Sequence, residues 1–123
     1  GWYTTFLSSI IPEIRSSYAF TGTIPLILRP FENNKGDFEQ SGSKIFEEID
    51  YWDLYLLSTI DKFNKQNRKH FQVYNKNDTC CFGNPFASIM QEVSDNLGNS
   101  NFKVVSLNVD KHIINTNFLF SQF

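Results

Sequence analysis

Apolar and polar residues divide the first quarter of the chain into three short segments. Residues 1–7 alternate loosely and carry aromatic and β-branched side chains, which predicts a strand. Apolar residues then recur at helical spacing from Ile10, so we expect a short helix that reaches about Phe20. Residues 23–29 form an apolar run that predicts a buried strand. Pro25 places this strand at a sheet edge, or marks its start, because proline donates no ladder hydrogen bond.

The middle of the chain contains its clearest loop and one amphipathic stripe. Residues 32–43 are rich in asparagine, glycine, serine and acidic residues, which predicts a flexible loop. Beyond it, apolar residues recur at intervals of three and four, at Ile45, Ile49, Trp52, Leu56, Ile60 and Phe63. The stripe predicts a helix over residues 52–66, whereas residues 44–48 fit either a short strand or the beginning of that helix.

The second half of the chain has a more regular pattern. Residues 70–74 fit a strand, and a helix is expected to open at Pro85 and to end at Gly98. Residues 102–109 and 113–120 then form two apolar segments around a turn, which predicts a hairpin. Together these elements predict an α+β (or α/β) fold, with a mixed β-sheet flanked by two to three helices.

Composition limits the number of domains and the classes of partner. The chain has 123 residues, and its hydrophobic fraction of 41% is enough for a substantial core in one domain. A net charge of −2 makes a nucleic-acid partner unlikely, because such proteins need a basic face. No apolar run approaches the ~20 residues of a membrane span, so no membrane association is expected. The basic cluster over residues 62–70 is most simply the solvated end of a helix.

The chain begins at Gly1 without an initiator methionine or a signal-peptide pattern. We therefore expect either a single domain over residues 1–123 or a fragment of a longer domain.

The opening residues, Gly-Trp-Tyr-Thr-Thr-Phe-Leu at positions 1–7, resemble the strand of MPN (JAMM-like) domains that runs Gly-Trp-Tyr-His-Ser/Thr-His-Pro. The likeness extends to about residue 50 through the order of the predicted elements, with a helix, a hydrophobic strand before Pro30, a polar loop and a further strand. In the metalloprotease members of this family the two histidines bind zinc. Here Thr4 and Phe6 stand in their places and Leu7 replaces the proline. A hydroxyl and a phenyl ring cannot replace two imidazoles, so the resemblance implies a non-catalytic relative with no metal ligand and no cofactor.

The resemblance also implies a function and a setting. Non-catalytic MPN relatives are subunits of the proteasome lid, the signalosome and translation-initiation factor three, so it implies a scaffold in a cytoplasmic or nuclear assembly whose partners are other protein subunits. The strands that precede this motif in the family are missing here. The strand with Trp2 and Tyr3 would therefore offer an unpaired edge for strand addition. A further contact patch is expected at Tyr51, Trp52 and Tyr55, because tyrosine and tryptophan are enriched at interfaces.

Two other functions remain open. Cys80 and Cys81 precede a predicted helix N-terminus, which activates thiols, so a small cysteine-dependent enzyme or redox protein is one alternative. Adjacent cysteines rarely bond to each other, and we expect one buried and one exposed thiol in a reducing compartment. His70 and His112 lie in separate segments and predict no metal site. The other alternative is a stand-alone acidic binding protein of the immunity type.

Overall fold

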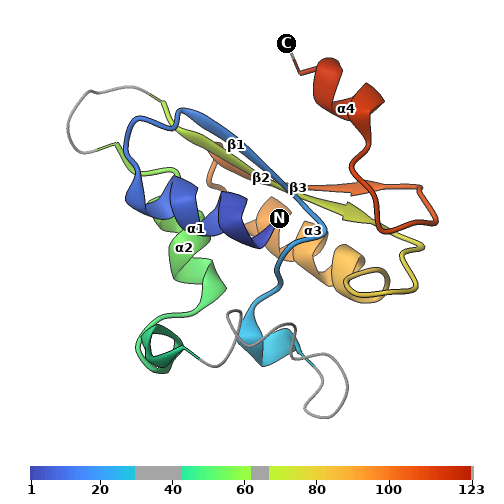
Figure 1. Cartoon of the computed structure of the whole chain (residues 1–123), viewed down its shortest axis with the longest axis horizontal. Coiled ribbons are helices and arrows are strands. Elements are labelled where there is room, and N and C mark those ends of the chain that lie inside the picture. Colours follow the sequence, from blue (N-terminus) through green and yellow to red (C-terminus); the bar gives the residue numbers. More distant parts are fainter. Residues whose placement is uncertain (30–42, 62–66, 123) are drawn as a thin grey trace.

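The fold is α+β, as the sequence predicts (Figure 1). The computed structural model describes residues 1–29, 43–61 and 67–122. The three strands of the sheet are β1 (Ser16–Phe20), β2 (Lys69–Asn75) and β3 (Phe102–Leu107). They lie in the order β1-β2-β3, and both pairs are parallel. The α-helices of the described residues are α1 (Trp2–Ile10), α2 (Tyr51–Leu57), α3 (Phe86–Leu97) and α4 (Thr116–Phe120).

Helices α1, α2 and α3 lie on one face of the sheet, below it in Figure 1. From β2, Gln72 donates a hydrogen bond to Thr5 of α1 over 2.9 Å. Also from β2, His70 stacks on Tyr55 of α2 with 5.6 Å between the ring centroids. Met90 of α3 is fully buried in the same core cluster as Tyr55. The core therefore lies between these three helices and one side of the sheet.

Helix α4 lies over one end of the opposite face of the sheet, above it in Figure 1. Phe118 of α4 packs edge-on against Phe20 of β1, with ring centroids 6.2 Å apart. Farther along the same face, Tyr18 and Phe71 stack on each other at 4.7 Å and remain partly exposed. Side chains at this end of the outer face therefore reach solvent.

Arg68 ties two helices to the sheet from a buried position. Its guanidinium donates to backbone carbonyls at or just beyond the C-terminal ends of α1 and α2, those of Ser8, Ile11, Ile14, Leu57 and Ile60. Helix C-termini carry partial negative charge, so a cation is well placed there. The prediction of a solvated helix end is wrong for Arg68 and His70, which are 3% and 0% exposed. Residues 62–66 of that cluster lie outside the described residues.

The predictions for the first thirty residues are wrong in three places. Residues 1–7 belong to helix α1, residues 16–20 form strand β1, and the following apolar run contains a 3-10 turn at Leu26–Leu28 where a strand was expected. Helix α1 turns Thr5 and Ser8 toward the sheet, and both hydroxyls are hydrogen-bonded. Because this buried face is partly polar, the spacing of apolar residues alone does not reveal the helix.

The predictions for the second half are mostly confirmed. Strands β2 and β3 and helix α3 occupy the expected segments, and α3 ends at Gly98, whose φ of +64° lies in the left-handed region that glycine tolerates. The hairpin is wrong, because residues 116–120 form helix α4 and β3 pairs with β2.

The middle of the chain is confirmed only in part. Helix α2 begins at the expected place, after a capping box in which Asp50 and Asp53 exchange hydrogen bonds with the backbone, but it ends at Leu57. Lys44–Glu47 is a 3-10 turn. The loop predicted over residues 32–43 lies almost entirely outside the described residues. None of the helices that the structure describes is long and apolar enough to cross a membrane.

Candidate functional site

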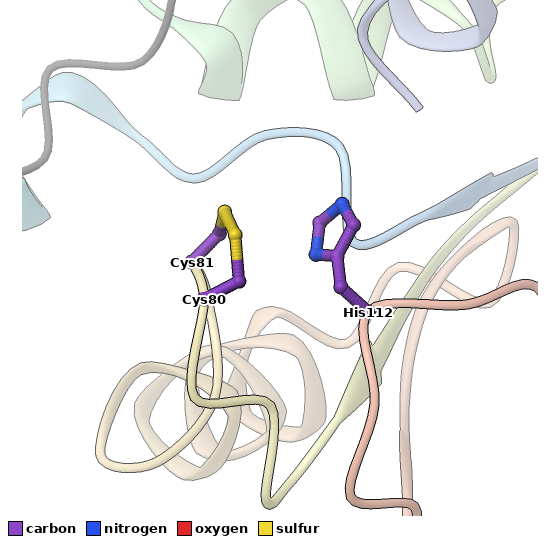
Figure 2. Close-up of side chains that lie close together, drawn as sticks. All are labelled: Cys80, Cys81 and His112. Atoms are coloured by element: carbon purple, nitrogen blue, oxygen red, sulfur yellow. A yellow bond between two sulfur atoms is a disulfide. The ribbon is translucent and has the colours of Figure 1, made fainter.

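The segments that follow the three strands meet at the carboxyl edge of the sheet. Thr21 follows β1, the turn with Asp78, Cys80 and Cys81 follows β2, and His112 comes after β3. Figure 2 shows the two cysteines and His112 facing each other from separate segments. In open parallel sheets, ligands and reacting groups are usually found at this edge.

Cys80 and Cys81 are joined by a disulfide between neighbouring residues. This corrects the expectation that they do not bond, because the turn after β2 brings the two sulfurs together on one side of the backbone. Cys80 is exposed and Cys81 is half-buried. The pair is therefore accessible to reactants from solvent, chiefly through Cys80.

The imidazole of His112 lies next to the two cysteines. Its ring nitrogen and the two sulfurs all lie within 4.8 Å of one another. Nδ1 of His112 also lies 2.7 Å from Oδ2 of Asp78. The histidine side chain is 44% exposed, whereas that of Asp78 is only 1% exposed. A buried carboxylate thus holds a histidine that still reaches solvent.

Asp78 also fixes the cysteine turn itself. While Oδ2 accepts from His112, Oδ1 accepts a hydrogen bond from the backbone N–H of Cys80 over 2.9 Å. The carboxylate therefore links the backbone of the disulfide to the imidazole ring. Such a shared anchor sets the position of one group relative to the other, which a catalytic or ligand site requires.

The backbone around His112 is held by a buried asparagine at the end of β2. Asn75 is 0% exposed, and its Nδ2 donates to the carbonyls of Lys111 and Ile113, over 2.7 and 2.9 Å. These carbonyls belong to the residues immediately before and after His112. Asn75 therefore fixes the local chain from which the imidazole projects.

The cysteine turn closes tightly at Gly83. A Cβ atom at this position would lie 2.4 Å from the carbonyl oxygen of Asp78, a distance that side chains do not adopt. The next residue, Asn84, donates its backbone N–H to the carbonyl of Lys76 over 2.8 Å. Glycine lets the two ends of the turn approach, and this approach places Cys80 and Cys81 beside Asp78.

The hydrogen bonds assign the tautomer of His112. A carboxylate can only accept, so Nδ1 carries the proton that is donated to Asp78. When the ring is neutral, Nε2 keeps its lone pair, and the hydroxyl of Thr21 lies 3.4 Å from it and can donate. Thr21 has a φ of +42°, a backbone conformation that non-glycine residues adopt mainly where the surroundings impose it. The arrangement leaves Nε2 as the nitrogen that can take a proton or a metal ion.

The other histidine of the sequence is far from solvent and serves the core. His70 is fully buried, with Nδ1 2.6 Å from the Ser17 hydroxyl and Nε2 2.7 Å from Nε2 of Gln72. Burial, with a smaller contribution from the nearby Arg68 charge, lowers the pKa of His70 to about 3. This histidine is therefore neutral and structural, and it does not serve as the partner base of the cysteines.

Sequence reasoning finds the two cysteines and misses both of their partners. Asp78 lies two positions before Cys80 and looks like an ordinary turn residue, and His112 is separated from Cys81 by all of α3 and β3. The one available signal is the parallel topology, because it gathers the segments after β2 and β3 at one edge. The expected hairpin gave residues 102–109 a different neighbour.

The predicted contact patch is corrected for two of its residues. Tyr51 and Tyr55 are both 0% exposed and belong to the core cluster, because α2 turns them toward the sheet. Trp2 and Trp52 are half-buried against this cluster, and Tyr3 is 69% exposed. A role in contacts for Trp2, Tyr3 and Trp52 stays a prediction.

No protein-family model, curated protein or solved structure matches this chain. The resemblance to MPN domains therefore stays a prediction that residues 1–50 alone support. Its first element differs from expectation, because the segment with Trp2 and Tyr3 is helical. This helix cannot offer the unpaired strand edge that was expected there, and the outer strands of the sheet are β1 and β3.

Proposed function

We propose that this chain is a thiol–disulfide redox protein whose reactive group is the Cys80–Cys81 pair. The observation that carries the proposal is the position of the pair beside His112, with Asp78 binding both the imidazole and the backbone of Cys80. Asp78 thus fixes the pair relative to an imidazole that reaches solvent.

The proposed reaction exchanges the disulfide with two external thiols, which belong either to a small molecule or to a protein. An external thiolate attacks the exposed sulfur of Cys80, and the electron pair of the broken S–S bond leaves on the sulfur of Cys81, which takes a proton. A second external thiolate attacks the external sulfur of the mixed disulfide, and Cys80 leaves and is protonated. Two external thiols are oxidised to one disulfide, and the protein disulfide is reduced to two thiols.

His112 is the group that moves the protons in this scheme. Because Asp78 accepts from Nδ1, Nε2 of the neutral ring is the nitrogen that takes the proton of an incoming thiol. The imidazolium then returns this proton to the departing sulfur of Cys81. Asp78 stabilises the transient positive charge on the ring, since it lies in contact with it and is shielded from water.

The test is an equilibration of the native chain in buffers of reduced and oxidised glutathione, with alkylation and mass measurement of the thiols. We expect one reversible transition in which both thiols appear together, and in Cys81→Ser a mixed disulfide trapped on Cys80. A synthetic peptide of residues 76–84 is the matched control, because it contains both cysteines without His112. The proposal fails if the native chain is reduced by dithiothreitol no faster than this peptide.

A second candidate function is that of an interaction subunit, the role that the MPN resemblance implies. The observation that favours it is the outer face of the sheet, where the stacked rings of Tyr18 and Phe71 remain partly exposed. Parallel sheets are usually covered on both faces. Ile114 and Phe120, at 60% and 72% exposed, add apolar surface in and just before α4.

This second role is tested by placing a photo-crosslinking amino acid at Phe71 and, as a control, at Glu92 on the exposed side of α3. If the outer face binds a protein subunit, the Phe71 position yields a discrete crosslinked species and the Glu92 position does not. Equal, diffuse crosslinking from the two positions would contradict the role.

A further inference from the structure

We infer that the reduced site binds one Zn²⁺ ion through the sulfurs of Cys80 and Cys81 and the imidazole of His112. This inference rests on the proposed redox function only in that it needs the reduced form of the same pair. It goes beyond that function because it assigns a metal ion to the reduced state.

The donor set is the first argument. Two thiolates and an imidazole are ligands that Zn²⁺ favours, whereas Ca²⁺ and Mg²⁺ require oxygen donors. In a tetrahedral site with metal–ligand bonds of about 2.0–2.3 Å, neighbouring donor atoms lie about 3.5–3.8 Å apart. The two sulfurs and one ring nitrogen of His112 already lie within 4.8 Å of one another. Reduction separates the sulfurs, and a movement of the exposed His112 side chain that turns Nε2 toward them then completes the set.

The second argument is the carboxylate behind the histidine. Ligand histidines in zinc sites usually donate their other ring N–H to a carboxylate or carbonyl, which fixes the ring and makes it a better donor. Asp78 does this for Nδ1 of His112 over 2.7 Å, from a side chain that is 1% exposed. It also holds the backbone N–H of Cys80, so it supports two of the three ligands.

Charge and access agree with this assignment. Two thiolates neutralise the charge of the ion, and binding releases two protons from the reduced pair. Cys80 and His112 are both exposed, so a fourth position stays open to water or to an external thiol. The disulfide and the zinc complex use the same two sulfurs and exclude each other. The ion therefore protects the reduced pair from oxidation, and oxidation releases the ion.

The experiment titrates the chain with Co²⁺ without oxygen, after reduction by a phosphine, which supplies no competing thiol. We expect one equivalent of Co²⁺ to give thiolate-to-metal absorption, and one equivalent of Zn²⁺ to abolish it. The air-oxidised chain is the matched control and should give no such absorption. Cys81→Ser and His112→Gln should each weaken binding strongly, and Asp78→Asn by about 10–100-fold.

Several outcomes would overturn the inference. They are the absence of thiolate-to-cobalt absorption in the reduced chain, binding that His112→Gln leaves unchanged, and two chains per ion. Circular dichroism of each variant shows whether the fold is kept. If Asp78→Asn unfolds, Co²⁺ binding by His112→Gln alone tests the role of the imidazole. Failure to bind Co²⁺ with a normal glutathione transition would leave the redox proposal standing. Binding by a pair that never forms a disulfide would refute the redox proposal and support the zinc site.

Discussion

The carboxylate of Asp78 lies 2.7 Å from Nδ1 of His112, at the point where the segments after β2 and β3 meet. The two residues are 34 positions apart in the sequence, and the parallel pairing of the strands brings them together.

Asp78→Asn should slow the reduction of the disulfide while leaving the fold intact. The amide keeps the size of the side chain but has one donor group and loses the negative charge that supports the imidazolium. We expect the rate of reduction by dithiothreitol to fall about tenfold or more. This is less than the rate loss that follows removal of a general acid–base group itself. The matched control is Asp95→Asn on the exposed side of α3, which should react like the parent chain. A normal rate in Asp78→Asn would exclude the carboxylate from the reaction.

Gly83→Ala should disturb the site through the backbone. The added methyl group would lie 2.4 Å from the carbonyl oxygen of Asp78, so the turn must shift and carry the cysteines away from His112. We expect a lower melting temperature together with slower disulfide reduction.

Gly98→Ala provides the comparison for this variant. Its φ of +64° makes alanine unfavourable by about 1 kcal/mol, but nothing lies within 4 Å of the new atom and the site is remote. This variant should melt earlier and keep the parent rate. If both variants keep the parent rate, the turn does not position the cysteines.

Arg68→Met should be strongly destabilising. It leaves the buried carbonyl of Ser8 and partly buried carbonyls at the ends of α1 and α2 without their donor, and each buried group that loses its partner costs about 1–3 kcal/mol. We expect the free energy of unfolding to fall by at least about 3 kcal/mol in urea denaturation. Lys69→Met, at the exposed neighbouring position, should change it by less than about 0.5 kcal/mol. Equal effects of the two changes would contradict the role assigned to Arg68.

His70 should make the fold sensitive to acid. Burial lowers the pKa of this residue to about 3, whereas an unfolded histidine titrates near 6.5. Between these values the unfolded chain binds a proton that the folded chain refuses, so stability falls as the pH drops from about 6.5 to about 3. The loss approaches about 5 kcal/mol at the lower limit.

The measurement is urea denaturation at several pH values in the parent chain and in His70→Gln. Both chains share every other titrating group, so the difference between their slopes isolates this histidine. The variant should show a shallower decline of stability with acid. Parallel declines would mean that His70 is protonated in the folded protein.

The elements with strong periodicity could be predicted from the sequence. In α3 the apolar side chains Met90 and Ala87 face the core, and Gly98 supplies a clear end, so both the helix and its boundary are readable. Helix α1 could not be read in the same way. Its buried positions are Thr5 and Ser8, and their hydroxyls also bind Gln72 of β2 and Ser58 at the end of α2, contacts that form only in the folded chain.

Only part of the candidate site could be predicted, because tertiary structure brings its residues together. The pair at Cys80 and Cys81 is visible as a sequence feature, but its partners are selected by tertiary structure. Asp78 looks like an ordinary turn residue, and His112 like a surface histidine, until the parallel order of β2 and β3 is known. The burial of Arg68 could not be predicted either. A charged side chain is expected in solvent, and the carbonyls that bind this one lie at the ends of two separate helices.

The hydroxyl and amide groups beneath α1 have a consequence for how the chain finds its final arrangement. A helix that packs on a purely apolar surface can shift by a turn or rotate at little cost in free energy, because apolar contacts are not directional. Here Thr5 meets Gln72, and Ser8 meets Ser58, in directional bonds of 2.9 Å that hold in only one seating. The first helix is thus held in a single register against the sheet and α2. A slip of one turn would leave four polar side chains in a dry interior without hydrogen-bond partners.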